Sequence, residues 1–209
     1  MKSISRFAQT VVRSGIRARF SILTIALTYI AFIILGIVLT HMGNLFALKS
    51  RDQLVSKAMQ QDPASIAGNK GDNLQAALID IGGNLIIGAI PKTVSGMAVI
   101  PAYPLVAYQG WIGGIVSVRD DHSSRLDNIR SAEYYLLTLL LQIIAYSLAV
   151  GAGVNVGIAM FRPQPYYQGH KWLGIIPKEA LRDVGRIYML VIPIFLIASL
   201  WEFLSPWNL

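Results

Sequence analysis

Polar residues interrupt an apolar stretch near the middle of the chain, and their spacing is that of one helix ridge. Asp80, Asn84, Gly88 and Lys92 recur at every fourth position, so in a helix they lie on the same side. A carboxylate held there could bind a proton or a cation. Alternatively, it could accept hydrogen bonds from a helix end or a loop. The sequence leaves both interpretations open for Asp80.

Four further polar residues lie within or beside apolar stretches. Glu133 is the first residue of the fourth such stretch. A carboxylate there would interact favourably with the positive N-terminal end of a helix. Gln142 and Asn155 lie farther in and are expected to join helices through hydrogen bonds. Glu202 ends the last stretch, just before Ser205–Pro206, and we expect a structural role for it.

The residue types needed for the common catalytic and metal sites are missing or scattered. The chain has no cysteine, and its three histidines, His41, His122 and His170, stand on different segments. No nucleophile–base pair, phosphate-binding loop or dinucleotide fingerprint is present in the sequence. We therefore predict a protein that is not an enzyme and that uses no metal and no cofactor.

The composition is that of a membrane protein. Hydrophobic residues make up 54% of the 209 residues and charged residues only 14%, whereas soluble domains have about 25% charged residues. The net charge is +7, and the basic residues cluster beside apolar runs. This placement favours anionic lipid headgroups over nucleic acid as the partner.

Five stretches are apolar and long enough for helices that cross a bilayer. They cover residues 20–41, 75–91, 94–118, 133–160 and 187–204. The second and third are separated only at Pro91–Lys92, which predicts a tight hairpin. The predicted fold is an all-α polytopic transmembrane helix bundle, with residues 20–209 forming one domain. A short amphipathic helix over residues 50–61 should stop at Asp62–Pro63.

The basic residues also predict an orientation. With the N-terminus in the cytoplasm, the segments on that side carry 11 Lys/Arg against two acidic residues. The segments on the other side carry seven against six. We therefore expect an integral protein of the plasma membrane, which is the inner membrane of a prokaryote, with the C-terminus outside.

Residues 1–19 form a segment of their own, rich in arginine and free of acidic residues. Its apolar and basic residues fall on opposite helical faces, which predicts an interfacial helix lying on an anionic leaflet. The side chains expected at lipid headgroups are Arg6, Arg13, Arg17 and Arg19. Two alternatives are a solvated basic tail and a mitochondrial presequence. We expect no cleavable signal peptide.

Small residues at helical spacing predict close helix crossings. Gly110 and Gly114 form one such pair, and Gly153 and Gly157 form another. Each pair has the small-x-x-x-small spacing that lets two backbones approach.

The segment GGNLIIGAIPKTVSGMAVIPAYPLVAYQGWIGG, residues 82–114, resembles the core of the stage II sporulation protein M family. Asn84, Gly96 and the Gln109–Gly114 run stand where that family shows an Asn, a Gly and an Asn-Gly-x-x-x-Gly. The fourth stretch begins with Glu133 and ends in a glycine-rich run, and Glu202 precedes a short Pro-containing tail, as in the family. Gln109 replaces the family's Asn. Its His-Gly before the Glu is also missing, since Ile129 and Arg130 stand there.

The resemblance implies a multi-pass membrane protein of undefined activity. Sporulation members are membrane partners of cell-wall remodelling proteins during engulfment, a role that we do not transfer to this chain. Gly96 would be a further packing residue. We expect a scaffold or accessory subunit that binds other integral membrane proteins or further copies of itself. The alternative is a small transporter that uses Asp80, Asn84 and Glu133.

Overall fold

The chain folds into a bundle of helices. The computed structural model describes residues 2–162 and 164–206, and it describes side chains from residue 8 onward. The α-helices are α1 (Lys2–His41), α2 (Leu45–Gln61), α3 (Pro63–Asn69), α4 (Asn73–Gly82), α5 (Ile90–Gly96), α6 (Ala102–Ile115), α7 (Ile129–Phe161) and α8 (Lys178–Leu204). A π-helix, η1 (Gly83–Ala89), joins α4 to α5. The predicted all-α class is confirmed.

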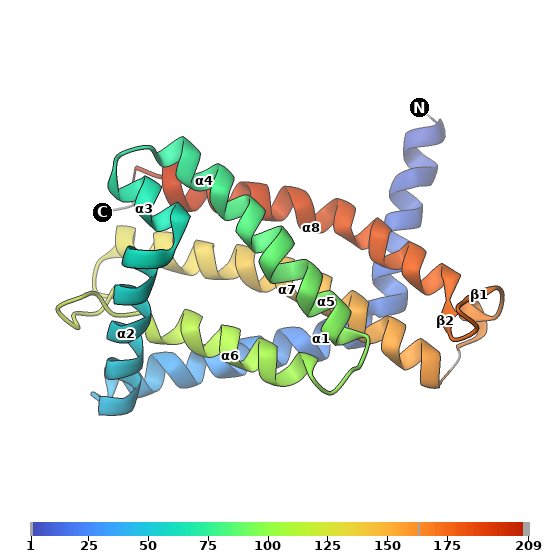
Figure 1. The fold of residues 1–209 in the computed structure, drawn as a ribbon, viewed down its shortest axis with the longest axis horizontal. Helices are drawn as coiled ribbons and strands as arrows, with labels where there is room; N and C mark the ends of the chain where they lie inside the picture. Colours follow the sequence, from blue (N-terminus) through green and yellow to red (C-terminus); the bar gives the residue numbers. More distant parts are fainter. Residues whose placement is uncertain (1, 163, 207–209) are drawn as a thin grey trace.

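Most of the long helices run along the longest axis of the molecule (Figure 1). At one end lies a minimal β-hairpin, β1 (Lys171–Trp172) paired with β2 (Ile176–Pro177), after the short 3-10 helix η2 (Pro165–Tyr167). We call this the hairpin end. Helix α2 lies across the other end, which we call the α2 end. The N-terminal part of α1 leaves the bundle at a steep angle near the hairpin end, whereas α8 finishes at the α2 end.

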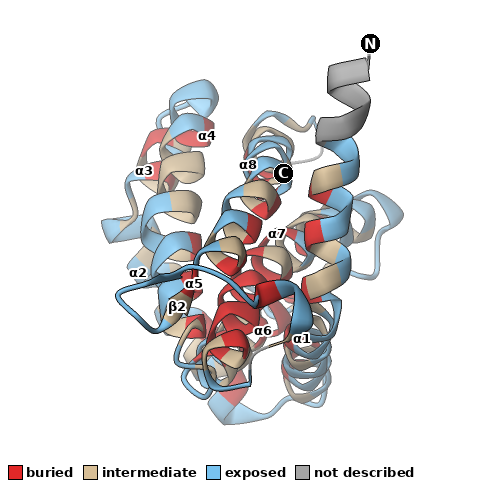
Figure 2. Ribbon diagram, turned by 90° about the vertical axis from the view of Figure 1, so that its right-hand side faces the viewer, coloured by how far each residue is buried: buried red, intermediate tan, exposed pale blue. Residues whose placement is uncertain are grey.

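Helix α7 is the central helix. Every residue from Ala149 to Gly157 is buried, and the buried residues gather where α7 meets its neighbours (Figure 2). Three glycines and several small residues in this run let other helices come close. The outer faces instead carry large apolar side chains, such as Phe20, Leu27 and Ile87, that remain exposed.

Two pairs of helices lie side by side and run in the same direction. Along α1 and α6, Thr24 meets Tyr103 at 3.2 Å and Thr40 meets Ser117 at 3.3 Å between their side-chain oxygens. Along α5 and α7, the Thr93 hydroxyl donates to the Ala149 carbonyl at 3.0 Å. Parallel neighbours need a connection that returns across the bundle. For α1 and α6 this connection is formed by α4, η1 and α5, which come between them in the sequence and run in the opposite direction.

The predicted hairpin break is in the wrong place. The helix does not stop at Pro91–Lys92 but continues to Gly96, and the chain turns over residues 97–101. Pro91 is the second residue of α5, separated from η1 by Ile90, and it stands in the first turn, where the missing proline N–H disturbs the helix least. At the turn, Val99 has a φ of 64°, which is unusual for a β-branched residue.

Other predicted boundaries also shift. There is no helix end between residues 19 and 20, because α1 is continuous from Lys2 to His41. The third stretch, predicted over 94–118, forms a helix of only 14 residues, about 21 Å long. Among the described residues, four helical segments are long and apolar enough to cross a membrane: Ala8–His41, Asn73–Gly96, Ile129–Phe161 and Lys178–Leu204.

Candidate functional site

Asp80 lies inside the bundle and accepts two side-chain hydrogen bonds on the same oxygen. Asn84, one turn later, donates to Asp80 Oδ2 at 2.8 Å. Ser199 of α8 donates to the same atom at 2.5 Å. The Tyr146 hydroxyl of α7 then donates to Asn84 Oδ1 at 2.7 Å. We call these four residues the Asp80 cluster, and it connects α4, η1, α7 and α8.

The other two members of the predicted ridge contact the same tyrosine. A Cβ added to Gly88 would lie 2.5 Å from the Tyr146 hydroxyl, so only glycine leaves room for the ring. The Lys92 ammonium lies 4.3 Å from the centre of the Tyr146 ring and donates to Gln109 Oε1 at 2.7 Å. Asn84, Gly88 and Lys92 therefore face α7 and share Tyr146 as a contact, whereas Asp80 contacts Ser199 of α8.

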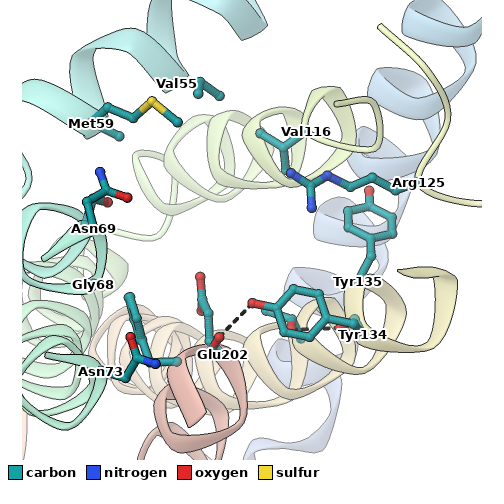
Figure 3. Close-up of a pocket in the computed structure, with 14 residues that line it drawn as sticks. Val55, Met59, Gly68, Asn69, Asn73, Val116, Arg125, Tyr134, Tyr135 and Glu202 are labelled. Carbon is teal, nitrogen blue, oxygen red and sulfur yellow. Dashed lines mark hydrogen bonds between the residues drawn. The ribbon is translucent and has the colours of Figure 1, made fainter. Parts of the chain in front are cut away.

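A cavity of ≈ 580 Å³ opens at the α2 end, and one of its lining residues, Glu202, lies near Asp80. Its walls come from α2, α3, the start of α4, the loop after α6, and the facing ends of α7 and α8 (Figure 3). The side chains of Arg125 and Glu202 both point into it, from different walls. The Tyr134 hydroxyl donates to the Glu202 carbonyl at 2.7 Å and so fixes the end of α8 against α7.

Arg125 is the unusual group in this cavity. Its Nε atom is buried and has no hydrogen-bond partner among the described residues. Burial lowers the pKa of Arg125, and the nearby positive charge of Arg51 lowers it further. An arginine nevertheless stays charged at neutral pH. The nearby Asp120 is bonded instead to Arg51, at 2.5 Å.

A second polar cluster lies at the hairpin end, centred on a carboxylate that is 1% exposed. Asp183 accepts from Ser14 at 2.7 Å, from Arg17 Nε at 2.6 Å and from Arg186 at 2.9 Å. Arg17 also reaches the carboxylate through a terminal nitrogen. Tyr167 donates at 3.0 Å. We call these five residues the Asp183 cluster.

The Asp183 cluster extends to α7 through Asn155. The Asn155 amide donates to the Tyr167 hydroxyl at 2.8 Å. Burial raises the pKa of Tyr167 to about 12, so the hydroxyl keeps its proton at neutral pH and donates to Asp183. Asn155 thus joins α7 to the loop before α8.

The predicted headgroup arginines have different surroundings. Arg13 and Arg19 are exposed, and Arg19 lies over the Phe20 ring at 4.7 Å. Arg17 is bonded to Asp183 and its side chain is 20% exposed, so its contact with a lipid headgroup stays a prediction. That pattern did not account for an acidic residue arriving from α8. The side chain of Arg6 lies outside the described residues.

The remaining predicted polar residues are placed as follows. Glu133 is exposed and stands in the second turn of α7, which begins at Ile129, so it is not at the helix N-terminus as predicted. The N-cap is Asn128, whose side chain accepts from the Arg130 N–H at 3.0 Å. Gln142 is half-buried and lies within hydrogen-bonding reach of Glu202.

The five glycines predicted to pack helices lie at two crossings. A Cβ at Gly110 or Gly114 would meet the α1 backbone, at Tyr29 O and Ile33 O respectively. At the α5–α7 crossing, a Cβ at Gly153 would meet Thr93 O. There Gly96 lies against Val150 O, and Gly157 lies against the Met97 carbonyl.

Sequence reasoning missed several partners. Tyr146 stood inside an apolar run without a neighbouring charge, although a tyrosine in the middle of such a run is itself a signal. Ser199 stood three residues before Glu202 and was not considered as its neighbour. Arg125 and Asp183 were counted only as loop charges. Their contacts depend on how distant segments meet, which spacing along one helix does not reveal.

No family model, no curated protein and no solved structure matches this chain.

Proposed function

We propose that the chain is an integral membrane protein whose five apolar segments cross the bilayer. Large apolar side chains on the outer faces, such as Leu27 and Ile87, are exposed without protein partners around them, and a bilayer would cover them. The α6 segment is short, but it lies beside α1 from Thr24 to Thr40. It would therefore cross the same depth of membrane.

The basic hairpin end would face the cytoplasm and the α2 end the outside. The N-terminal part of α1 would then lie along the inner leaflet, which is supported by its steep departure from the bundle (Figure 1). Exposed Arg13 and Arg19 would contact anionic headgroups. Arg17 would instead anchor this segment to α8 through Asp183.

Within the membrane, we propose a scaffold or accessory subunit. The observation that carries this proposal is that polar groups of the apolar helices bond to one another across helix boundaries. The Asp80 and Asp183 clusters each connect at least three segments, and the glycine crossings bring backbones into contact. Such a bundle resists rearrangement and leaves its apolar faces to partners.

Site-specific photo-crosslinking at native expression level tests this role. A crosslinker at Ile87, which is 78% exposed on η1, should give a discrete adduct with another membrane protein or with a second copy. The matched control is Val191, which is fully buried and should give none. Only lipid adducts at Ile87, together with a monomer in mild detergent, would contradict the scaffold.

The cavity favours a second candidate, a small transporter. Glu202 lines the cavity and lies near Asp80, a residue that the transporter alternative predicted to serve such a path. In this case Asp80→Asn should assemble normally in liposomes and lose solute flux. Unchanged flux in the folded variant would remove this candidate.

A further inference from the structure

The cavity at the α2 end carries a basic side chain and an acidic side chain on different walls. Arg125 projects from the loop before α7, and Glu202 projects from the last turn of α8 (Figure 3). The charges of Asp80 and Asp62 lie close enough to act on Glu202. One side of the cavity therefore carries a cation, and the other side carries a carboxyl group that has further acidic residues near it.

These charges are not neutralised by one another. Among the residues that the structure describes, neither Arg125 nor any of the three carboxylates forms an ion pair. The buried Nε of Arg125 has no acceptor. A partly buried charge without a counter-charge is costly, so Arg125 offers binding energy to an anionic group of a ligand. A cationic group beside Glu202 would favour the ionised form of that carboxyl and pair with it.

The shape and lining fit a small polar molecule. The volume of ≈ 580 Å³ is in the range of ligand pockets, about 300–1,000 Å³. Neutral hydrogen-bonding side chains from three further elements, Asn69, Asn73 and Thr138, line the space. A bare metal ion is a poorer fit, because the described residues contain no group of three acidic or histidine side chains that could hold one.

We propose that this cavity binds a zwitterionic group. Its carboxylate or phosphate contacts Arg125, and its ammonium contacts Glu202. A simple anion would be repelled by Glu202, Asp80 and Asp62, and a simple cation by Arg125. Two sources carry this chemistry: a free amino acid, or the headgroup of an ethanolamine phospholipid. The site does not depend on the scaffold role, since a bound lipid suits a scaffold and a free amino acid suits a transporter.

Titration of the delipidated full chain in detergent tests the proposal. The probes are each standard amino acid, dihexanoyl phosphatidylethanolamine, and the singly charged propionate, ethanolamine and dihexanoyl phosphatidylglycerol. We expect one zwitterionic class to bind and the singly charged probes to bind at least about tenfold more weakly, since hydrogen bonds to charged groups contribute about 1.5–3 kcal/mol each. The class that binds identifies the source.

Matched variants assign the two contacts. Arg125→Gln and Glu202→Gln should each raise the dissociation constant at least about tenfold. The matched controls are Arg119→Gln in the same loop and Glu133→Gln on the exposed side of α7. They change the same residue types away from the cavity lining and should leave the dissociation constant unchanged. Arg125→Lys keeps the positive charge and should lose less affinity than Arg125→Gln.

Three results would overturn the site. They are binding of no zwitterionic probe, equal binding of the singly charged probes, and unchanged affinity in folded Arg125→Gln and Glu202→Gln. Because the scaffold is tested by crosslinking at Ile87, its failure and the failure of this site are separate outcomes.

Discussion

The two ends of the bundle use the same residue types in opposite ways. At the hairpin end, Arg17 and Asp183 are in direct contact, and Ser14, Tyr167 and Arg186 complete the coordination of the carboxylate. At the α2 end, Arg125 and Glu202 face one cavity without forming an ion pair. An arginine and a carboxylate therefore stabilise one end and stay available at the other.

The difference follows from what surrounds each carboxylate. Asp183 is 1% exposed and is reached by donors from α1, α8 and the loop containing Tyr167. Glu202 stands in the last turn of α8, where negative rather than positive groups lie near it. Residues that fold a protein and residues that await a ligand are thus distinguished by their unmet contacts, not by their type.

Removing the charge of Asp183 should have the largest effect. In Asp183→Asn, Arg17 and Arg186 lose their buried counter-charge, which should destabilise the fold by about 3–5 kcal/mol. Thermal unfolding and the monodisperse yield in detergent would measure the loss. Arg182→Gln is the control, because Arg182 is 68% exposed. Equal stability of the two variants would show that the hairpin end is not held by this cluster.

Tyr167→Phe should have a smaller effect in the same direction. It removes the hydroxyl that donates to Asp183 and accepts from Asn155, so one buried amide loses its partner. The expected cost is about 1–3 kcal/mol. Tyr166→Phe, at an exposed neighbour, should be neutral in the same unfolding assay. A neutral Tyr167→Phe would mean that water replaces the hydroxyl.

Glu202→Gln should change stability in the opposite direction. It replaces a carboxyl that lies near Asp80 and Asp62 and makes no ion pair, so it removes the repulsion that ionisation of Glu202 adds. We expect a gain of up to about 1 kcal/mol, as is common when functional charges are removed. A loss as large as that of Asp183→Asn would erase the contrast between the ends.

The smallest expected effect is the loss of stability that protonation of Asp52 causes at low pH. Burial acts to raise the pKa of Asp52, but hydrogen bonds from His122 and Arg51 outweigh it and hold the pKa below its ordinary value. A carboxyl with a lowered pKa stabilises the fold at pH values above its pKa in the unfolded chain, which is about 4. This contribution is lost as the pH falls through the pKa of the folded state. Hydrogen exchange at α2 should therefore increase only below about pH 4. Asp52→Asn should abolish that pH dependence.

Much of the fold could be predicted from local pattern. The end of α2 at Gln61 follows from Asp62–Pro63, because Asp62 caps α3 by accepting from the Ser65 N–H at 2.9 Å. The four-residue spacing also predicted which face of α4–α5 is polar. Both depend on residues close together in sequence, for which spacing is sufficient.

The features that could not be predicted depend on contacts between segments that are distant in the sequence. The turn at 97–101 could not be predicted, because the π-helix that precedes Pro91 has no simple sequence mark. The pairing of Arg17 with Asp183 joins residues 166 positions apart. The cavity exists because α2 and α3 lie across the ends of α7 and α8, which no single element specifies.

The wide turns of η1 determine whether the ridge stays aligned. In an α-helix each residue advances by about 100°, so positions four apart overshoot a full turn by about 40° and drift steadily around the axis. Over the three steps from Asp80 to Lys92 that drift would reach about 120°. The i→i+5 bonding of η1 turns the backbone less per residue and cancels part of the drift. A single tyrosine ring on α7 can consequently touch residues from Asn84 to Lys92.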